Sequence, residues 1–202
     1  NKMDREGKYP LELIDDVENT LGISCFPVTW PIGMGDRFVG LFHRLENKVY
    51  KYKKGSDEAE VMDVEGWHDD KIRALTEPSL YEKFCEDMEL MEVALGPFDE
   101  EEFLRGKVSP MSFGSAKNNW GVDLFMRQFA QWAPGPGQYL TADGEPVSPL
   151  DKGFSGFVFK IQANMDKRHR DRVAFLRVCS GQFDRGMKVK HQRLKRDLRL
   201  SY

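Results

Sequence analysis

Pro110-Met111-Ser112-Phe113-Gly114-Ser115-Ala116-Lys117 carries the clearest signal of this chain's architecture. Its first four residues have the character of a short strand, and the pair Asn118-Asn119 predicts the cap of a helix that begins near Trp120. A strand that passes through a loop into a helix is the setting of many ligand-binding loops in α/β folds. The sequence therefore predicts an α/β domain with a binding loop at its centre.

A second motif, Asn1-Lys2-Met3-Asp4, stands at the first residue of the chain. An N-K-x-D followed later by Ser-Ala-Lys is the pair of motifs with which P-loop GTPases recognise guanine, although either motif alone is a weak signal. Guanine presents two adjacent N–H donors, and a fixed carboxylate at Asp4 can accept both. We expect the Asn1 amide to bond the imidazole edge of the base and to tie the loop together. The stem of Lys2 can lie on the base, and Met3 is predicted to be the free position.

The later motif supplies the other half of the predicted base site. Small side chains at Ser115 and Ala116 let the backbone come close enough for an N–H to donate to the keto oxygen of guanine. Lys117 can cover the second face of the ring. Because adenine would leave the Asp4 carboxylate unpaired, such a site can discriminate by a factor of about 10,000 or more.

The phosphate-binding part of a GTPase is missing from the sequence. The two Gly-Lys pairs, Gly7-Lys8 and Gly106-Lys107, are followed by Tyr9 and Val108, so no G-x-x-x-x-G-K-[ST] motif occurs. Without phosphate-binding amides or a magnesium ligand, we expect no catalytic residue in this chain and no GTP hydrolysis by it alone. We expect the chain to be an excised fragment of a longer GTPase.

Composition favours a folded cytoplasmic protein with no membrane partner. The chain has 202 residues, of which 40% are hydrophobic, and no apolar run approaches the length of a membrane span. The sequence contains neither a signal-peptide nor a transit-peptide pattern, although an excised N-terminus could not show one. The four histidines, His43, His68, His169 and His191, show no metal-ligand spacing, so we expect no metal site.

Charge is distributed unevenly along the sequence. Residues 150–202 hold 14 Lys and Arg against 5 Asp and Glu, a net of +9, whereas residues 1–149 hold 16 against 28, a net of −12. A basic module favours contact with a polyanion, most simply RNA rather than DNA. The alternative interpretation is a solvated barrel surface.

Periodicity and turn residues predict two domains. We expect residues 1–133 to be the C-terminal part of a GTPase domain with an α+β subdomain inserted at about 25–108. A linker at 134–153 would then lead to an incomplete antiparallel β-barrel at 154–202. The predicted helices are Pro10 to Gly22, Ser79 to Leu95 with a Ser79/Glu82 capping box and a buried methionine stripe, and Trp120 to Trp132. The predicted strands are Cys25 to Ile32, Phe38 to Leu45, Lys48 to Tyr52, Ala59 to Val64, Phe154 to Ala163, Arg172 to Cys179, Met187 to Arg193 and Leu198 to Tyr202.

Several stretches resemble one family of translational GTPases. Val28-Thr29-Trp30-Pro31-Ile32-Gly33, Trp132-Ala133-Pro134, the run from Gly156 to Asp166 that ends in Gln-Ala-Asn-Met-Asp, and the run from His169 to Phe175 are similar to bacterial peptide chain release factor 3. The resemblance covers essentially the whole chain. Elongation factor G shares the architecture but lacks the Gln-Ala-Asn-Met-Asp and His-Arg-Asp-Arg elements, so it is the alternative family.

The resemblance implies a function. Members of this family use a GTP cycle, with Mg²⁺, on the ribosome in the cytoplasm to stimulate release and recycling of class-I release factors. The matching site positions are Asn1, Lys2, Asp4 and Ser115 to Lys117. A non-catalytic interaction scaffold is the alternative for the chain by itself, and it predicts no response to GDP or GTP.

One basic segment joins two of the predicted barrel strands. Lys167-Arg168-His169-Arg170-Asp171-Arg172 has five cationic or titratable groups in six positions. We expect Lys167, Arg168, Arg170 and Arg172 to contact ribosomal RNA phosphates. The alternative is a loop held by its own salt bridges to Asp166 and Asp171.

Overall fold

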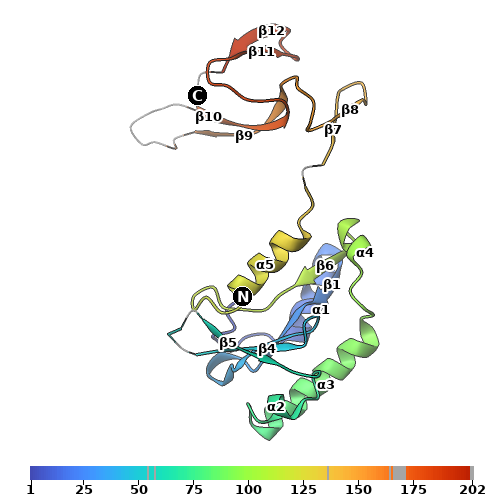
Figure 1. Ribbon diagram of the computed structural model, residues 1–202, viewed down its shortest axis with the longest axis vertical. Coiled ribbons are helices and arrows are strands. Elements are labelled where there is room, and N and C mark those ends of the chain that lie inside the picture. The colour runs from blue at the N-terminus through green and yellow to red at the C-terminus, as the bar shows by residue number, and fades with distance from the viewer. Residues whose placement is uncertain (54, 57, 136, 164, 166–171, 201–202) are drawn as a thin grey trace. The chain divides into compact units, whose positions relative to one another are not determined.

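A computed structural model describes residues 1–53, 55–56, 58–135, 137–163, 165 and 172–200 (Figure 1). The chain divides into two compact units, Asn1–Ala133 and Pro134–Tyr202. The first unit contains both motifs of the predicted base site, and the second contains the predicted barrel strands.

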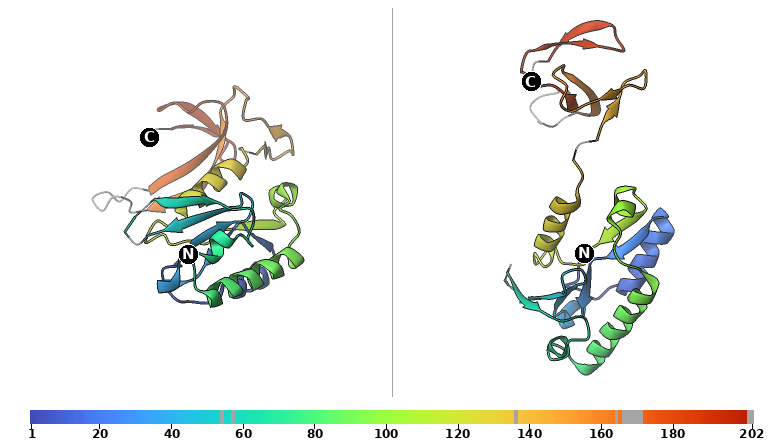
Figure 2. Two further views of the ribbon diagram at one scale, coloured as in Figure 1. Left: turned by 60° about the horizontal axis from the view of Figure 1, so that its bottom comes forward. Right: turned by 45° about the vertical axis from the view of Figure 1, so that its right-hand side comes forward.

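A parallel strand pair lies at the centre of the first unit. β1 (Ser24–Pro27) pairs with β6 (Val108–Met111), with Ser24 opposite Val108 and Pro27 opposite Met111. α1 (Pro10–Leu21) and α5 (Val122–Trp132) lie on opposite sides of this pair (Figures 1 and 2). Parallel strands need a crossover connection, and here the crossover holds a whole subdomain. The predicted α/β character of this unit is therefore present.

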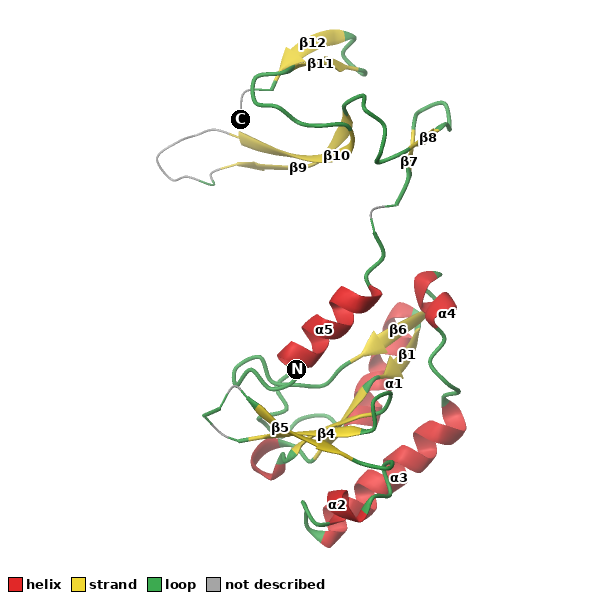
Figure 3. Ribbon diagram, viewed as in Figure 1, coloured by secondary structure: helices red, strands yellow, loops and turns green. Residues whose placement is uncertain are grey.

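The inserted subdomain is built on a four-stranded antiparallel sheet (Figure 3). Its strands follow the chain order β2-β3-β4-β5. The elements of the crossover are β2 (Thr29–Ile32), η1 (Gly35–Arg37), β3 (Gly40–His43), β4 (Lys48–Tyr52), β5 (Ala59–Asp63), α2 (Asp70–Arg73), α3 (Pro78–Ala94) and α4 (Glu100–Leu104). The turn at Asn47, with φ of 52°, closes the predicted hairpin.

β2 and β3 of the inserted sheet are buried on both faces because a helix packs on each face. Successive residues of a strand point to opposite faces. Phe42 meets Phe84 of α3 edge to face, with ring centroids 5.8 Å apart. The next residue, His43, contacts Gln128 of α5 on the other face. All four residues of β3 are therefore buried.

Several predicted elements are confirmed. α1 begins at Pro10 and ends at Leu21, followed by Gly22, which takes a left-handed conformation with φ of 66°. β5 covers Ala59–Asp63, within the strand predicted over Ala59 to Val64. Met88 and Met91 are each 2% exposed, so the methionine stripe of α3 belongs to the core.

The strand predicted over Cys25 to Ile32 is wrong as a single element. The chain breaks at Val28, whose N–H donates to Met111 O at 2.8 Å, and then continues as β2 in the other sheet. The lower limit of the insertion, expected near residue 25, consequently falls inside β1. Burial cannot reveal this break because both strands are buried throughout most of their length.

Two predicted helix starts also differ. α3 begins at Pro78, with Glu77 at the N-cap position, so Ser79 and Glu82 do not form the predicted capping box. α5 begins at Val122 after Gly121, which has φ of 72°. Asn118-Asn119 therefore precede the helix instead of capping it. Hydrogen bonds that close the preceding loop between Ser115 and Trp120 delay the helix start.

The second unit consists of three antiparallel hairpins in the part of the chain that is described. They are β7 (Tyr139–Leu140) with β8 (Pro146–Val147), β9 (Ser155–Ala163) with β10 (Arg172–Ser180), and β11 (Lys188–His191) with β12 (Arg196–Arg199). Among the described residues, each hairpin is a separate two-stranded sheet, so these strands do not form one continuous barrel sheet. The predicted strand Met187 to Arg193 ends at His191, and the next strand begins at Arg196 instead of Leu198. A turn with Lys195 at φ of 51° accounts for the shift.

Candidate nucleotide-recognition site

The N-terminal motif is a tight turn anchored at its third position. Met3 is 3% exposed, and its backbone N–H donates to Gly114 O at 3.1 Å. Its carbonyl accepts the Gly35 N–H at 2.9 Å. The prediction that Met3 is the free position is therefore wrong, because its side chain fills the core while its backbone joins the later loop and the insertion. The sequence does indicate the burial of Met3, because it is the one apolar residue among the four of the motif.

Asp4 is held by the second motif. The Ser115 hydroxyl donates to Asp4 Oδ1 at 2.6 Å, and Ser115 is fully buried. The Asp4 side chain is only 10% exposed, and its second oxygen, Oδ2, lies 3.7 Å from Arg5 Nε. The Ser115 hydrogen bond is the main reason that the pKa of Asp4 lies below its usual value, with smaller contributions from the charges of Arg5 and Lys117. Asp4 is thus a fixed carboxylate that is ionised at neutral pH.

Asn1 closes the other side of the loop. Its Oδ1 accepts the Ala116 backbone N–H at 3.0 Å. The prediction that Asn1 ties the loop together agrees with this contact. The sequence predicts that an N–H of this loop donates to the keto oxygen of guanine, and the Ala116 N–H belongs to the loop. A bound base would therefore share this donor with Asn1 or displace the Asn1 side chain from it.

The later loop is closed by its own backbone. Ser115 and Trp120 exchange two N–H···O bonds of 2.9 Å each, and the Asn118 N–H points to Ser115 Oγ at 3.4 Å. Asn119 takes a left-handed conformation with φ of 59° inside this loop. This closure fixes Ser115 and places the start of α5 after Gly121.

The two lysines of the motifs have exposed side chains, as a role on the faces of a base requires. Lys2 sits in the turn with φ of 70° and is exposed, and Lys117 is exposed beside Asp4. A cavity of about 270 Å³ opens next to Asp4 and Lys117. Long, flexible lysine stems can cover flat apolar surface while their ammonium groups stay in water.

Three aromatic residues that the sequence reasoning did not select line the same cavity. Phe38 stacks on Trp120 with ring centroids 5.0 Å apart and planes at 11°, and Tyr52 lies beside both rings. Phe38 and Tyr52 come from the insertion, whereas Trp120 follows the second motif. Their contact could not be derived from spacing because it joins segments distant in sequence.

The other predicted contact residues are only partly described. Lys167, Arg168 and Arg170 lie outside the described residues. Arg172 is exposed and begins β10, opposite Ala163. Within the described ranges, no group of three or more His, Cys, Asp or Glu side chains gathers in a way that could hold a metal. No helix in those ranges combines the length and apolar character needed to cross a membrane.

Known proteins share both the sequence and the fold of this chain. A family model for elongation factor G domain 2 matches residues 153–201. Peptide chain release factor 3 of Gloeobacter violaceus is 47% identical over 100% of this chain, which covers 38% of that protein's length. The crystal structure of a Thermus thermophilus protein matches with a TM-score of 0.57 and 22% identity, covering 98% of this chain and 29% of that chain. At that identity, the solved structure supports the fold alone.

Proposed function

This chain is related over its whole length to peptide chain release factor 3, which confirms the resemblance found in the sequence, and we propose that it is part of a translational GTPase that acts in translation termination. The proposed protein uses a GTP cycle on the ribosome, in the cytoplasm, to stimulate release and recycling of class-I release factors. The chain spans 38% of that relative. The activity, nucleotide and partners of the whole protein are therefore all part of the proposal.

The contact between the two motifs is the observation that supports this proposal most directly. Ser115 holds Asp4 by a 2.6 Å hydrogen bond, and Asn1 holds Ala116 by a 3.0 Å hydrogen bond. A base-recognition site needs a fixed carboxylate beside a fixed backbone N–H. Both groups are present, and residues far apart in sequence supply them.

The proposed roles follow from the chemistry of each group. Asp4 accepts the two N–H donors of guanine, for which Oδ2 has free acceptor capacity beside its long contact to Arg5. The Ala116 N–H donates to the keto oxygen, and the stems of Lys2 and Lys117 cover the two faces of the ring. An adenine base offers no pair of donors to Asp4, so the site rejects it.

The residues for phosphate and Mg²⁺ are not among those that form this site. The sequence has no phosphate-binding loop, and the described residues gather no carboxylate cluster for a cation. In the proposed GTPase, a bound Mg²⁺ would supply positive charge to the phosphates of GTP, and none of the described residues would hold it. We assign no catalytic residue to this chain, and we propose that the chain alone binds nucleotide weakly and does not hydrolyse GTP.

Nucleotide binding tests this proposal. GDP binding, with ADP as the control, is measured by calorimetry on the chain alone and on the protein extended upstream from Asn1. We expect the extended protein to bind GDP and to exclude ADP, and a ribosome recycling assay with a class-I release factor then tests the finer function. If neither protein binds GDP, the motifs are a coincidence and the scaffold alternative applies.

An elongation factor G-like translocase is the second candidate, because residues 153–201 match the model of its domain 2. The two candidates predict different products on the ribosome. Release of a bound class-I factor after peptide release supports the first candidate. Movement of the messenger RNA by one codon supports the second.

Ribosomal RNA is the proposed partner of the basic segment. Arg172 is exposed at the start of β10, and Lys167, Arg168 and Arg170 precede it in sequence. Replacing Arg168, Arg170 and Arg172 by Ala should weaken ribosome association of the intact protein. The slope of log K against log salt should decrease by about one unit for each phosphate that the variant no longer neutralises. An unchanged slope would instead indicate a loop that stabilises only itself.

A further inference from the structure

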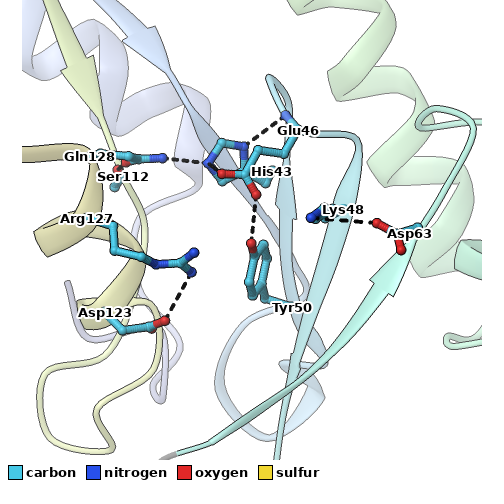
Figure 4. A network of polar contacts seen from close by, with 9 residues as sticks. All are labelled: His43, Glu46, Lys48, Tyr50, Asp63, Ser112, Asp123, Arg127 and Gln128. Atoms are coloured by element: carbon cyan, nitrogen blue, oxygen red, sulfur yellow. Dashed lines mark hydrogen bonds and ion pairs between the residues drawn. The ribbon is translucent and has the colours of Figure 1, made fainter. Parts of the chain in front are cut away.

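A buried polar cluster connects the inserted sheet to α5 (Figure 4). His43 closes β3 and is 3% exposed, and its Nε2 lies 2.7 Å from the side-chain amide of Gln128. The other end of that amide lies 3.0 Å from Ser112 Oγ. The Glu46 carboxylate approaches His43 Nε2 at 3.5 Å and accepts the Tyr50 hydroxyl at 2.7 Å. None of these residues lines the cavity beside Asp4.

The hydrogen bonds determine the protonation of the His43 ring. The Glu46 backbone N–H points to Nδ1 at 3.2 Å and can only donate, so Nδ1 is an acceptor and the ring proton is on Nε2. Gln128 must then present its amide oxygen to Nε2–H and its amide N–H to Ser112 Oγ. This orientation exchanges the oxygen and nitrogen at the end of the Gln128 amide, which have similar shape, and gives His43 Nε2–H and the amide N–H one acceptor each.

Thr29 and His43 are linked, directly and through Gln128, to the two consecutive residues that follow β6, Phe113 and Ser112. Thr29 of β2 is the cross-strand partner of His43, and its Oγ1 accepts the Phe113 N–H at 3.0 Å. His43 reaches Ser112 through Gln128. Both contacts therefore end within two residues of Gly114, the residue whose carbonyl accepts the Met3 N–H.

We infer that Thr29, His43 and Gln128 are positioning residues. They hold the loop so that the Ala116 N–H can donate to the keto oxygen of guanine. This inference rests on the proposed nucleotide function. Ser112 and Phe113 are the last residues before the loop, so an error in their position passes directly into Ser115 and Ala116. Such an error reaches Asp4 only in part, because Ser115 holds Asp4 Oδ1 while Met3, next to Asp4, is also anchored to Gly35.

Three nucleotides distinguish the contact made by the 6-oxo group of the base from the contact made by its 2-amino group. GDP has a 6-oxo group and a 2-amino group, IDP keeps only the 6-oxo group, and the ribonucleoside diphosphate of 2-aminopurine keeps only the 2-amino group. If the cluster positions the Ala116 N–H, its loss should weaken the ligands that carry the 6-oxo group more than the ligand that lacks it. A general loosening of the fold would weaken all three ligands by the same factor.

The test uses the protein extended upstream from Asn1 and calorimetry with these three nucleotides. Gln128→Leu removes the hydrogen bonds that connect His43 to Ser112. Ser112→Ala removes only the hydrogen bond between Ser112 and Gln128, and because Ser112 is half-buried this milder variant should fold. We expect both variants to bind GDP and IDP about three- to tenfold more weakly, as the loss of one hydrogen bond predicts. Binding of the 2-aminopurine nucleotide should weaken by a smaller factor. Tyr9→Phe is the matched control, because it removes a part-buried hydrogen bond to Asp87 in the same unit and Tyr9 does not line the cavity beside Asp4.

Each result has one meaning. A selective loss of GDP and IDP binding supports the inference. An equal loss of all three nucleotides, or no loss of any, overturns it and leaves the proposed function intact. If the unaltered protein does not prefer GDP to ADP, the proposed function itself fails, and the inference fails with it.

Discussion

The hydroxyl of Ser115 donates to the carboxylate of Asp4 across 111 residues of sequence. The bond is 2.6 Å long, and its donor is fully buried. It joins the two halves of the candidate base site and leaves the second carboxylate oxygen beside Arg5. The inserted subdomain lies between these two residues in the chain but does not interrupt their contact.

Ser115→Ala should therefore weaken GDP binding. Loss of a charge-assisted hydrogen bond of this kind costs about 1.5–3 kcal/mol, or about 10- to 150-fold in affinity, because Asp4 becomes free to rotate away from the base. Calorimetry on the protein extended upstream from Asn1 measures the change. Ser79→Ala, which removes an exposed hydroxyl on α3, is the control and should not alter binding. Equal affinities for the two variants would contradict the proposed role of Ser115.

The same substitution should raise the pKa of Asp4. The Ser115 bond is the largest cause of its low value, so in Ser115→Ala the pKa should move back toward 3.8. Because the folded-state pKa is depressed, ionisation of Asp4 stabilises the fold above about pH 3.8, and this stabilisation is lost as the pH falls through the folded value. Carbon NMR titration of the Asp4 carboxyl measures the shift. An unchanged titration would show that another group holds the carboxylate.

His43 should make stability fall in mild acid. Burial is the main cause that lowers its pKa below 6.5, the charges of Arg127 and Lys48 lower it further, and the Glu46 carboxylate opposes them. The native state then binds fewer protons than the unfolded state below about pH 6.5. The free energy of unfolding should fall by up to about 1.4 kcal/mol per pH unit until the folded pKa is passed.

Urea unfolding at a series of pH values measures this slope. His43→Asn should flatten it, whereas His68→Asn, which replaces an exposed histidine, should leave it unchanged. The idea is wrong if both variants retain the slope of the unaltered protein.

Thr29→Val should destabilise the first unit. Valine has nearly the shape of threonine, but it leaves the buried Phe113 N–H without its acceptor, which costs about 1–3 kcal/mol. Urea unfolding measures the loss. Thr20→Val, at an exposed position on α1, controls for the β-branched replacement and should change stability by about 0.5 kcal/mol or less. A similar loss in both variants would show that the Thr29 hydroxyl is not the cause.

Gly114→Ala should disrupt the candidate site through close backbone contact. A Cβ at this residue would lie 2.4 Å from Trp120 O, the carbonyl that accepts the Ser115 N–H. The loop must open to relieve the overlap, at a cost of about 1–3 kcal/mol in the free energy of unfolding. GDP affinity should fall with it. Gly96→Ala meets no atom within 4 Å and serves as the control. Normal GDP binding by Gly114→Ala would show that the loop tolerates this opening.

Local elements and the chemical types of the site residues could be predicted from the sequence alone. Pro10 and Gly22 mark the ends of α1 because proline suits the first helical turn and glycine adopts the left-handed conformation at a helix end. The pairing of N-K-x-D with Ser-Ala-Lys was readable because recognition of a base needs fixed residue types. Such signals depend on the properties of single residues and their near neighbours.

Which strands pair and which distant side chains touch could be seen only in the folded structure. Nothing in the run from Cys25 to Ile32 indicates that its first half pairs with β6 and its second half with β3, because burial on both faces removes the alternation that marks a strand's partner. The burial of Met3, the cluster at His43 and the stacking of Phe38 on Trp120 likewise join residues distant in sequence. Their positions follow from the packing of the whole unit, in which each contact depends on all the others.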